Sequence, residues 1–415
     1  MEVDPHFFRH ESGRLVAALA RLFGVHRLAL AEDVAQHAFC RALEVWKVRG
    51  IPENPSAWLL ATAKHRALDV LRQERTVRSL APELSRRLDV DGELANAVDD
   101  AFLAGSIQDE QLRMMFSCCH PRLAEAAQIS LILNILCGFG ASEIASALLV
   151  ERAAIEKRIS RGKHTLAESK TLFDLADAEF AARLTTVRQA LYLLFNEGYH
   201  GGARLDVVRQ ELCQEALRLT SLLAEHAPAA TPTTQALLAL MYLNAARLPA
   251  RVDAAGELVA LYEQDRSRWD ARLLTRGLTY FDASASGAEL SAYHVEAAIA
   301  VAHVSAPSFA ATDWAAVVQL YDRLMSVAPS PVVALNRAIA LGHRDGAARA
   351  LGALRSIAEV ERLASYPFYP AALGEFELRL GHLDAARQHF GAAIRLSRND
   401  AERHFLEKRL RSAGH

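Results

Sequence analysis

Apolar residues recur at helical spacing along the first part of the chain. In residues 7–27, Leu15, Leu19 and Leu22 share one face, which predicts an amphipathic helix. Residues 31–46 predict a second helix, because their apolar residues follow the 3.6-residue period. These residues are Val34, Ala38, Phe39, Ala42, Leu43 and Trp46.

Residues 51–55 contain two prolines and are predicted to form a loop. Ser56 can then cap a third helix over residues 57–75. Its core-facing positions are Trp58, Ala61, Ala67 or Leu68, and Leu71. Its other face carries Lys64, Arg66, Arg72 and Arg75. This basic face is either a binding surface or an ordinary solvated face with cationic side chains on the surface.

Four further helices are predicted near the middle of the chain. Helix resumes at residues 110–116, and Pro121 is predicted to open a helix over residues 121–138. Ser142 can cap a helix over 142–149, which a short break separates from a helix over 152–166.

The last of these helices has one apolar stripe and one charged face. The stripe consists of Ile155, Ile159, Gly162 and Leu166. The opposite face carries Arg152, Glu156, Lys157, Arg161 and Lys163. A basic second helix after a short turn is typical of a DNA-binding helix-turn-helix. An ordinary helical hairpin with a solvated basic face remains the alternative.

From about Asp174 the chain is alanine-rich and shows no strand-like alternation, so the sequence predicts an all-α protein. LGHRD at 341–345 recurs as LGHLD at 380–384, and Ala-Ala-Arg follows both, at 347–349 and 385–387. Tyr321 and Phe390 occupy similar apolar strings near two repeat lengths apart. This period predicts stacked helical hairpins of the tetratricopeptide kind. A non-repetitive helical bundle is the alternative.

Composition agrees with a soluble globular protein of two or three domains. The chain has 415 residues, of which 51% are hydrophobic and 23% charged. The apolar run at 129–139 is too short to span a bilayer, and no secretory leader opens the chain. Five cysteines without regular spacing indicate reduced thiols. We therefore expect a cytoplasmic protein that does not contact a membrane.

The net charge of −2 hides strong local differences. The basic face of helix 57–75 is followed by an acidic stretch that contains no basic residue. This stretch, residues 89–101, carries Asp89, Asp91, Glu93, Asp99 and Asp100. Residues 80–107 are therefore predicted to be an acidic linker.

The first 170 residues resemble the sigma-70 type transcription initiation factors in their extracytoplasmic-function form. AEDVAQHAFCRALEVW (31–46) is similar to the polymerase-binding helix of region 2, and NPSAWLLATAKHRALDVLRQER (54–75) to the helix that meets the −10 element. The unit at 142–166 resembles region 4, which reads the −35 element. The resemblance implies region 2 at 1–79, the acidic linker at 80–107 and region 4 at 108–172.

The second half resembles a helical-repeat extension found in a subgroup of these factors. The similar strings are LYLLFNEGY (191–199), SAYHVEAAIAVAH (291–303), PSPVVALNRAIAL (329–341) and ERHFLEKRL (402–410). The resemblance implies that residues 180–415 form a tetratricopeptide-like domain that regulates the sigma half within the same chain. Such a domain could also bind a protein or peptide partner.

The resemblance also implies roles for individual residues. Core RNA polymerase would contact Asp33, Gln36, Arg41 and Glu44. The −10 element of promoter DNA would contact Asn54, Lys64, Arg66, Arg72 and Arg75. The −35 element would contact Arg152, Ala153, Glu156, Lys157, Arg158, Arg161 and Lys163. Asn54 could equally be a turn residue before Pro55. His37 occupies a position where the family often has an acidic residue. The turn at Leu149-Val150-Glu151 lacks the family's frequent glycine, and Glu156 and Lys157 differ from the usual residues; these last two departures affect the expected promoter sequence and not the expected function.

Other polar groups invite different interpretations. Cys118-Cys119-His120 could bind a metal, but no second ligand pair is present, so a buried pair at a helix end is favoured. Gly198 is expected to end a helix over 182–197, and Asn196, Glu197, Gly198 and Tyr199 to form a turn between domains. No phosphate loop or nucleophile motif is present, so we expect no enzymatic activity, no cofactor and no bound metal.

Two functions remain open at this point. The first is a sigma factor, a dissociable subunit of RNA polymerase. The second is a helix-turn-helix regulator with a repeat-type sensor domain that does not replace sigma. Residues 31–75 distinguish them, because a simple regulator needs no second basic helix behind an aromatic core.

Overall fold

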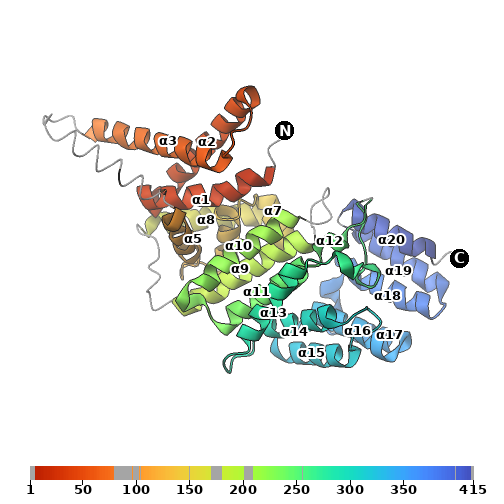
Figure 1. Cartoon of the computed structure of the whole chain (residues 1–415). Coiled ribbons are helices and arrows are strands. Elements are labelled where there is room, and N and C mark those ends of the chain that lie inside the picture. Colours follow the sequence, from red (N-terminus) through yellow and green to blue (C-terminus); the bar gives the residue numbers. More distant parts are fainter. Residues whose placement is uncertain are drawn as a thin grey trace. The chain divides into compact units, whose positions relative to one another are not determined.

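Most of the residues that the computed structural model of the protein describes are helical (Figure 1). These are residues 5–78, 96, 102, 104–148, 150–169, 180–200, 209–254, 256–397 and 399–412. No strand occurs among them; the pairing of Val252 with Leu258 is an isolated bridge. The prediction of an all-α protein is confirmed. The chain divides into two compact units, residues 1–194 and 195–415.

Unit 1 begins with three α-helices and one turn of 3₁₀ helix. They are α1 (Pro5–Phe23), η1 (Val25–Arg27), α2 (Leu28–Arg49) and α3 (Pro55–Arg78). The predicted first helix extended to residue 27, but α1 ends at Phe23 because Gly24 has a φ of 84°, which favours glycine. Leu15 and Leu19 are fully buried, as their helical spacing predicted.

The buried stripe of α2 is narrower than predicted. It follows i, i+4 spacing through alanine and ends at Trp46, which is 6% exposed and contacts the rings of Phe8 and Trp58. Leu43 was assigned to this stripe, but it is 59% exposed because it lies about 100° around the helix from Ala42. The core side of α3 likewise runs through Leu59 and Ala63, and the predicted core position Ala61 is exposed.

Four more helices complete most of unit 1. They are α5 (Ala104–Cys118), α6 (Glu125–Ile135), α7 (Ala141–Leu148) and α8 (Arg152–Glu168). The prediction that Pro121 opens α6 was wrong: residues 121–124 form a turn, and extended Ala124 precedes the helix. The predicted cap Ser142 lies inside α7, whose first turn is instead closed by Glu143 Oε2 accepting from Gly140 N at 2.8 Å.

Helix α8 packs through most of its predicted apolar stripe, although Ile159 is only partly buried. Ile155 and Leu166 of α8 are fully buried, and Gly162 faces α6 so closely that a Cβ would lie 2.6 Å from Leu131 Cδ1. Glycine at this position therefore lets the backbone of α8 approach α6 more closely than any larger residue would allow.

Helices from both predicted sigma domains pack together in unit 1. Helix α1 packs against α5, and α8 packs against η1. Two ion pairs span the same boundary: Arg21 to Glu110 at 3.3 Å and Arg9 to Glu143 at 3.0 Å. Almost all of the predicted acidic linker lies outside the described residues, although α5 already begins at Ala104, inside the predicted range.

Unit 2 is a series of helices in which most neighbours in sequence also pack in space. Its elements after α9 (Phe180–His200) are α10 (Gln210–Glu225), η2 (Ala227–Ala229), α11 (Pro232–Ala245), α12 (Leu248–Arg251), η3 (Leu261–Glu263), η4 (Arg266–Arg268), α13 (Ala271–Ser284), α14 (Ala292–Ser305), α15 (Trp314–Val327), α16 (Pro331–Asp345), α17 (Ala347–Arg355), η5 (Val360–Leu363), α18 (Phe368–Arg379), α19 (Leu383–Leu396) and α20 (Asp400–Ser412). Small polar side chains cap several of these helices, among them Asp270, Asp313 and Ser330.

Helix α9 does not end where the sequence predicted. It continues through Gly198 to His200, so residues 196–199 are helical and do not form a turn. Gly198 is buried, and a Cβ there would lie 2.8 Å from the carbonyl oxygen of Arg209 and from the backbone nitrogen of Cys213. Its role is therefore close packing against the start of α10, and Arg209 N donates to Gly198 O at 2.9 Å.

The repeated LGH strings do not occupy equivalent places in unit 2. Residues 341–345 form the last turn of α16, whereas residues 380–384 span the end of α18 and the start of α19. Two glycines, Gly346 and Gly381, do have the same backbone conformation: both have a positive φ, of 94° and 79°. Each of these two glycines lies between consecutive packed helices, 35 residues apart, which is shorter than the spacing of the strings.

Candidate functional site

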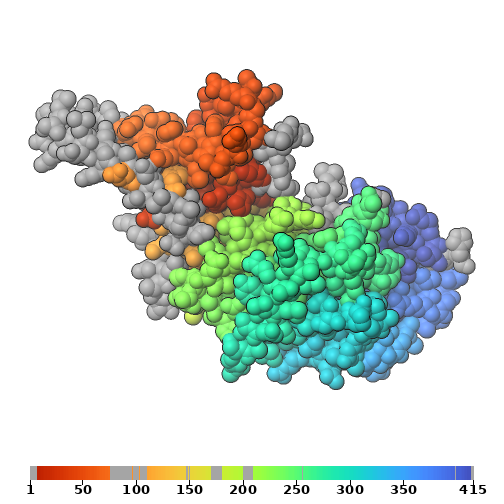
Figure 2. Space-filling model, viewed as in Figure 1, coloured from red at the N-terminus to blue at the C-terminus, as the bar shows by residue number. Residues whose placement is uncertain are grey.

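The outer face of α2 carries the residues that were predicted to bind polymerase. Asp33, Gln36, Arg41 and Glu44 are all exposed. Figure 2 shows the surface of α2 and α3 in orange. Arg41 and Glu44 form an i, i+3 ion pair at 3.0 Å, which orients both side chains along the helix surface.

Two large apolar side chains on α2 are exposed, although the sequence pattern was not used to predict this. Leu43 is 59% exposed and Val48 is 84% exposed. Single exposed apolar residues are common. Here the two lie on the same helix as four exposed charged and amide side chains, so α2 offers a mixed apolar and polar surface. The signal was present in the sequence, because Leu43 and Val48 do not fit the stripe through Ala38, Ala42 and Trp46.

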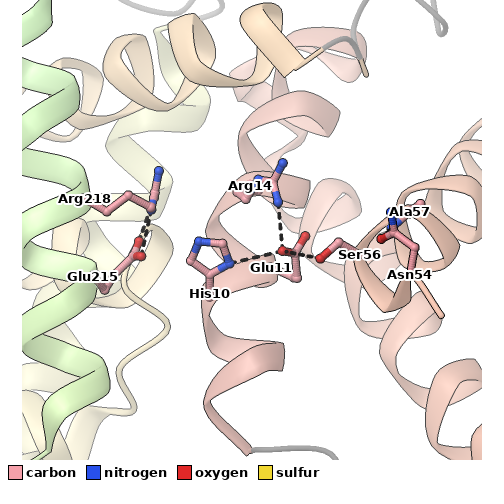
Figure 3. Close-up of polar contacts among 8 residues, drawn as sticks. All are labelled: His10, Glu11, Arg14, Asn54, Ser56, Ala57, Glu215 and Arg218. Carbon is pink, nitrogen blue, oxygen red and sulfur yellow. Dashed lines mark hydrogen bonds and ion pairs between the residues drawn. The ribbon is translucent and has the colours of Figure 1, made fainter. Parts of the chain in front are cut away.

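Asn54 caps α3. Its Oδ1 accepts a hydrogen bond from Ala57 N at 3.0 Å (Figure 3). Its carbonyl oxygen accepts a hydrogen bond from Trp58 N. Pro55 occupies the first helical position, where a missing N–H has no cost. The predicted cap Ser56 has a different role, since its hydroxyl donates to Glu11 Oε1 at 3.0 Å.

Glu11 of α1 is a buried carboxylate that the sequence pattern did not reveal. It is 1% exposed, and its Oε1 contacts His10 Nδ1, the Arg14 guanidinium and the Ser56 hydroxyl (Figure 3). Burial raises the pKa of Glu11, but the hydrogen bond from His10 and the charge of Arg14 outweigh it and leave this pKa below its usual value. The carboxylate therefore joins α1 to the first turn of α3.

The basic face of α3 is largely open to solvent. Arg66 and Arg72 are exposed, and Lys64 is half-buried. The side chain of Arg75 lies outside the described residues. Arg27 of η1 forms an ion pair with Glu74 and so connects η1 to the far end of α3. These cations could contact phosphate groups, which would supply affinity but little sequence information.

Helix α8 presents its first two turns to solvent. Arg152, Ala153, Glu156 and Lys157 are exposed, as is Arg161, and Arg158 is partly buried. Arg152 Nε and Glu156 Oε1 are 2.8 Å apart, so Glu156 is held by its own helix neighbour. Lys163 differs from the rest of the set because its Nζ lies 2.5 Å from Glu32 Oε1 on α2.

Cys118 and Cys119 are buried at the end of α5, at 0% and 2% exposure. Burial raises the pKa of both thiols, that of Cys119 to about 12. Among the described residues, no three His, Cys, Asp or Glu side chains are grouped so that they could hold a metal ion. The two cysteines are therefore part of the apolar core of unit 1.

The residues predicted between the domains lie within α9. Glu197 is 9% exposed and Tyr199 is 6% exposed, while Asn196 is partly buried. The guanidinium of Arg251 lies 4.0 Å from the centre of the Tyr199 ring. The sequence did not reveal this contact, because α12 is 52 residues further along the chain. No described helix is long and apolar enough to cross a membrane.

Comparisons with known proteins match two separate parts of the chain to known families and nearly the whole chain to one relative. Residues 7–77, which include most of α1 and all but the last residue of α3, match the family Sigma-70 region 2. Residues 183–285 match a family of unknown function (DUF6596). An uncharacterized protein of Rhizobium meliloti (strain 1021), R00370, is 37% identical over 398 residues, which is 95% of this chain and 92% of that protein. The chain therefore belongs to the same family as R00370, and its N-terminal part is a sigma-70 region 2 domain.

Proposed function

We propose that this protein is a sigma factor of the extracytoplasmic-function type, which directs core RNA polymerase to specific promoters. The observation that carries the proposal is the sigma-70 region 2 match over residues 7–77. It supports a sigma-factor-like role in transcription initiation. The proposal adds the −35 contact, the promoter specificity and the regulation by residues 180–415.

Helix α2 is the proposed polymerase contact. Leu43 and Val48 provide exposed apolar surface, and Gln36 and Arg41 provide polar groups beside it. Interfaces of this kind combine a desolvated apolar centre with a polar rim. The buried side of α2 is occupied by its own core, so the exposed face is the one available to a partner.

Helices α3 and α8 are the proposed DNA contacts. Arg66 and Arg72 would bind phosphates beside the −10 element, and Asn54 would contact a base there. Exposed residues in the first turns of α8 would enter the major groove at the −35 element, with Arg152 and Lys157 reaching base edges. Exposure supports Asn54, Arg66 and Arg72 of the −10 set and Arg152, Ala153, Glu156, Lys157 and Arg161 of the −35 set. Lys64, Arg158 and Lys163 are partly buried, and Glu32 already contacts Lys163.

Unit 2 is proposed to regulate the sigma half from within the same chain, as a tetratricopeptide-like stack. A tethered domain acts at a high effective concentration, about millimolar for short linkers, so that even a weak contact is well populated. Stacked helical hairpins also present extended surfaces that bind proteins or peptides.

The first test is in vitro transcription with purified core polymerase. We expect the protein and core together to start transcription at a matched promoter, and Gln36→Ala with Arg41→Ala to weaken capture of core. Glu53→Gln, at an exposed position outside α2, is the matched control. If transcription requires a second sigma factor, the protein is instead a helix-turn-helix regulator that does not replace sigma.

The second test addresses regulation by unit 2. A truncation at residue 175 would remove Phe180, whose ring stacks on Phe116 of α5 at 4.4 Å, and would damage unit 1. A protease site inserted within residues 201–208 instead separates the chain between α9 and α10 after folding. We expect cleavage to change the transcription rate. Equal rates before and after cleavage, with the same protease added to the uncleavable parent, would exclude regulation that depends on the tether.

A further inference from the structure

Unit 2 contains a group of cationic side chains beside Trp269 and Tyr199, which we call the arginine cluster: Arg247, Arg251 and Arg266. Trp269 is 7% exposed and lies just before α13. The guanidinium of Arg266 is 4.6 Å from the centre of the indole ring, and that of Arg247 is 5.8 Å from it. Two guanidinium groups therefore contact one aromatic side chain.

The arginine cluster has no neutralising partner in the described part of the chain. None of its three guanidinium groups forms an ion pair with a described carboxylate. Arg247 is 9% exposed, and its side chain makes one long hydrogen bond, from Nη1 to Asn244 Oδ1 at 3.5 Å. Buried arginines normally pair with an acid, because burying an unpaired charge is costly.

Several donors of the cluster are left unused. Arg247 Nε, Arg251 Nε and Arg266 Nη2 are buried without a hydrogen-bond partner, and so is Trp269 Nε1. Arg266 Nη1 is already engaged by the carbonyl oxygens of His303 and Ala306, both at 2.7 Å. Buried donors without acceptors are uncommon in folded proteins and call for a ligand or another explanation.

The electrostatic environment points in the same direction. Burial lowers the pKa of Arg247, and the charge of Arg251 lowers it further. Burial and the charges of Arg247 and Arg266 lower the pKa of His303 to about 4, so this imidazole is neutral near pH 7. Burial raises the pKa of Tyr199, yet Arg247 and Arg251 bring it below its usual value. The guanidinium charges of the cluster contribute to all three shifts, although burial is the largest cause of the low pKa values of Arg247 and His303.

We propose that the arginine cluster of unit 2 binds an oxyanion, the phosphate or carboxylate group of a small ligand. Guanidinium groups match both anions because their planar forks donate paired hydrogen bonds. Arg247 supplies the buried charge, Arg266 adds Nη2 while Trp269 fixes its plane, and Arg251 adds the third charge. The site does not involve α2, α3 or α8, so it does not depend on the proposed sigma activity.

The test measures binding to the full-length protein with inorganic phosphate and acetate as probes. Titration calorimetry and thermal unfolding are run at constant ionic strength, with chloride replacing the probe. We expect saturable binding and a saturable rise in Tm with at least one probe. Saturation by phosphate alone identifies a phosphate ligand, and saturation by acetate alone a carboxylate ligand; either result supports the proposal.

Variants separate this site from general salt effects. Arg247→Met should weaken binding at least tenfold, whereas Arg272→Met removes the same charge at an exposed position and should leave binding unchanged. If Arg247→Met does not fold by circular dichroism, Arg266→Gln serves in its place. The proposal would be overturned if neither probe binds saturably. It would also be overturned if a probe raises the Tm of the Arg247 and Arg272 variants equally.

Discussion

Lys163 Nζ lies 2.5 Å from Glu32 Oε1, so the helix proposed to read DNA is joined to the helix proposed to bind polymerase. Both side chains are about one-third exposed, at 29% and 31%. Part of the cationic surface of α8 is therefore neutralised within the free protein. Partly exposed pairs of this kind contribute about 0.2–1 kcal/mol, so the contact can be broken by a competing phosphate.

This relationship predicts the effect of Glu32→Gln on DNA binding. Loss of the ion pair leaves Lys163 available to phosphate, so affinity for a −35 duplex should rise by up to about fivefold. Fluorescence anisotropy of the full-length protein on a labelled duplex measures it. Glu53→Gln makes the same charge change at an exposed position outside α2. Equal increases in both variants would show a general charge effect and would contradict the prediction.

Asn54 allows the cap and the base contact to be separated. Asn54→Ala removes the acceptor for Ala57 N and should cost about 1 kcal/mol of unfolding free energy. Asn54→Ser keeps a capping oxygen and should retain wild-type stability in urea. Because serine lacks the amide donors, we expect its transcription from a matched promoter to fall. Unchanged transcription by the serine variant would assign Asn54 to capping alone.

Gly198 should be intolerant of any side chain. Its Cβ would lie 2.8 Å from backbone atoms of Arg209 and Cys213, which cannot rotate away. Gly198→Ala should therefore destabilise the packing of α9 on α10 by about 1–3 kcal/mol. The midpoint of urea unfolding followed by circular dichroism measures the effect. Gly352→Ala is the matched control, because no atom lies within 4 Å of its Cβ position.

The control Gly352→Ala should itself change the stability, in the opposite direction to Gly198→Ala. Gly352 lies within α17, where alanine is a better helix former by about 0.5–1 kcal/mol, so Gly352→Ala should raise the midpoint slightly. If Gly198→Ala raises stability as Gly352→Ala does, the prediction that α9 and α10 are too close for a side chain at residue 198 is wrong.

His303 makes stability depend on pH in a defined direction. Its folded pKa of about 4 is below the ordinary 6.5, so the unfolded chain binds more protons between these values. Stability is therefore fully present above pH 6.5 and falls as the pH drops toward 4, by about 1.5 kcal/mol between pH 6.5 and 5. His303→Phe, which keeps a ring against Trp314, should flatten this fall in Tm. His404→Gln, which removes an exposed histidine instead, serves as the control. Identical profiles for all three proteins would contradict the low pKa.

Most helices of unit 1 could be predicted because their signals are local. The 3.6-residue period of α8 identified Ile155, Gly162 and Leu166 as buried, and the structure agrees. Local signals did not identify the helix caps correctly, because several neighbouring residues can each cap the same helix. Ser56 and Ser142 were reasonable caps, but Asn54 and the Gly140–Glu143 contact lie at the observed helix starts. Ser56 instead serves a carboxylate 45 residues away.

The sequence by itself determined the helical class, the exposed charged faces of α2, α3 and α8, and the region 2 resemblance, because side-chain periodicity and motif strings are local properties. Only the tertiary structure decided that Gly198 packs two helices together, that Lys163 reaches Glu32, and that two arginines lie against Trp269 while a third lies against Tyr199. These relationships join residues that are distant along the chain. The free energy of burial and charge pairing that selects them depends on the packed chain as a whole, which no local pattern records.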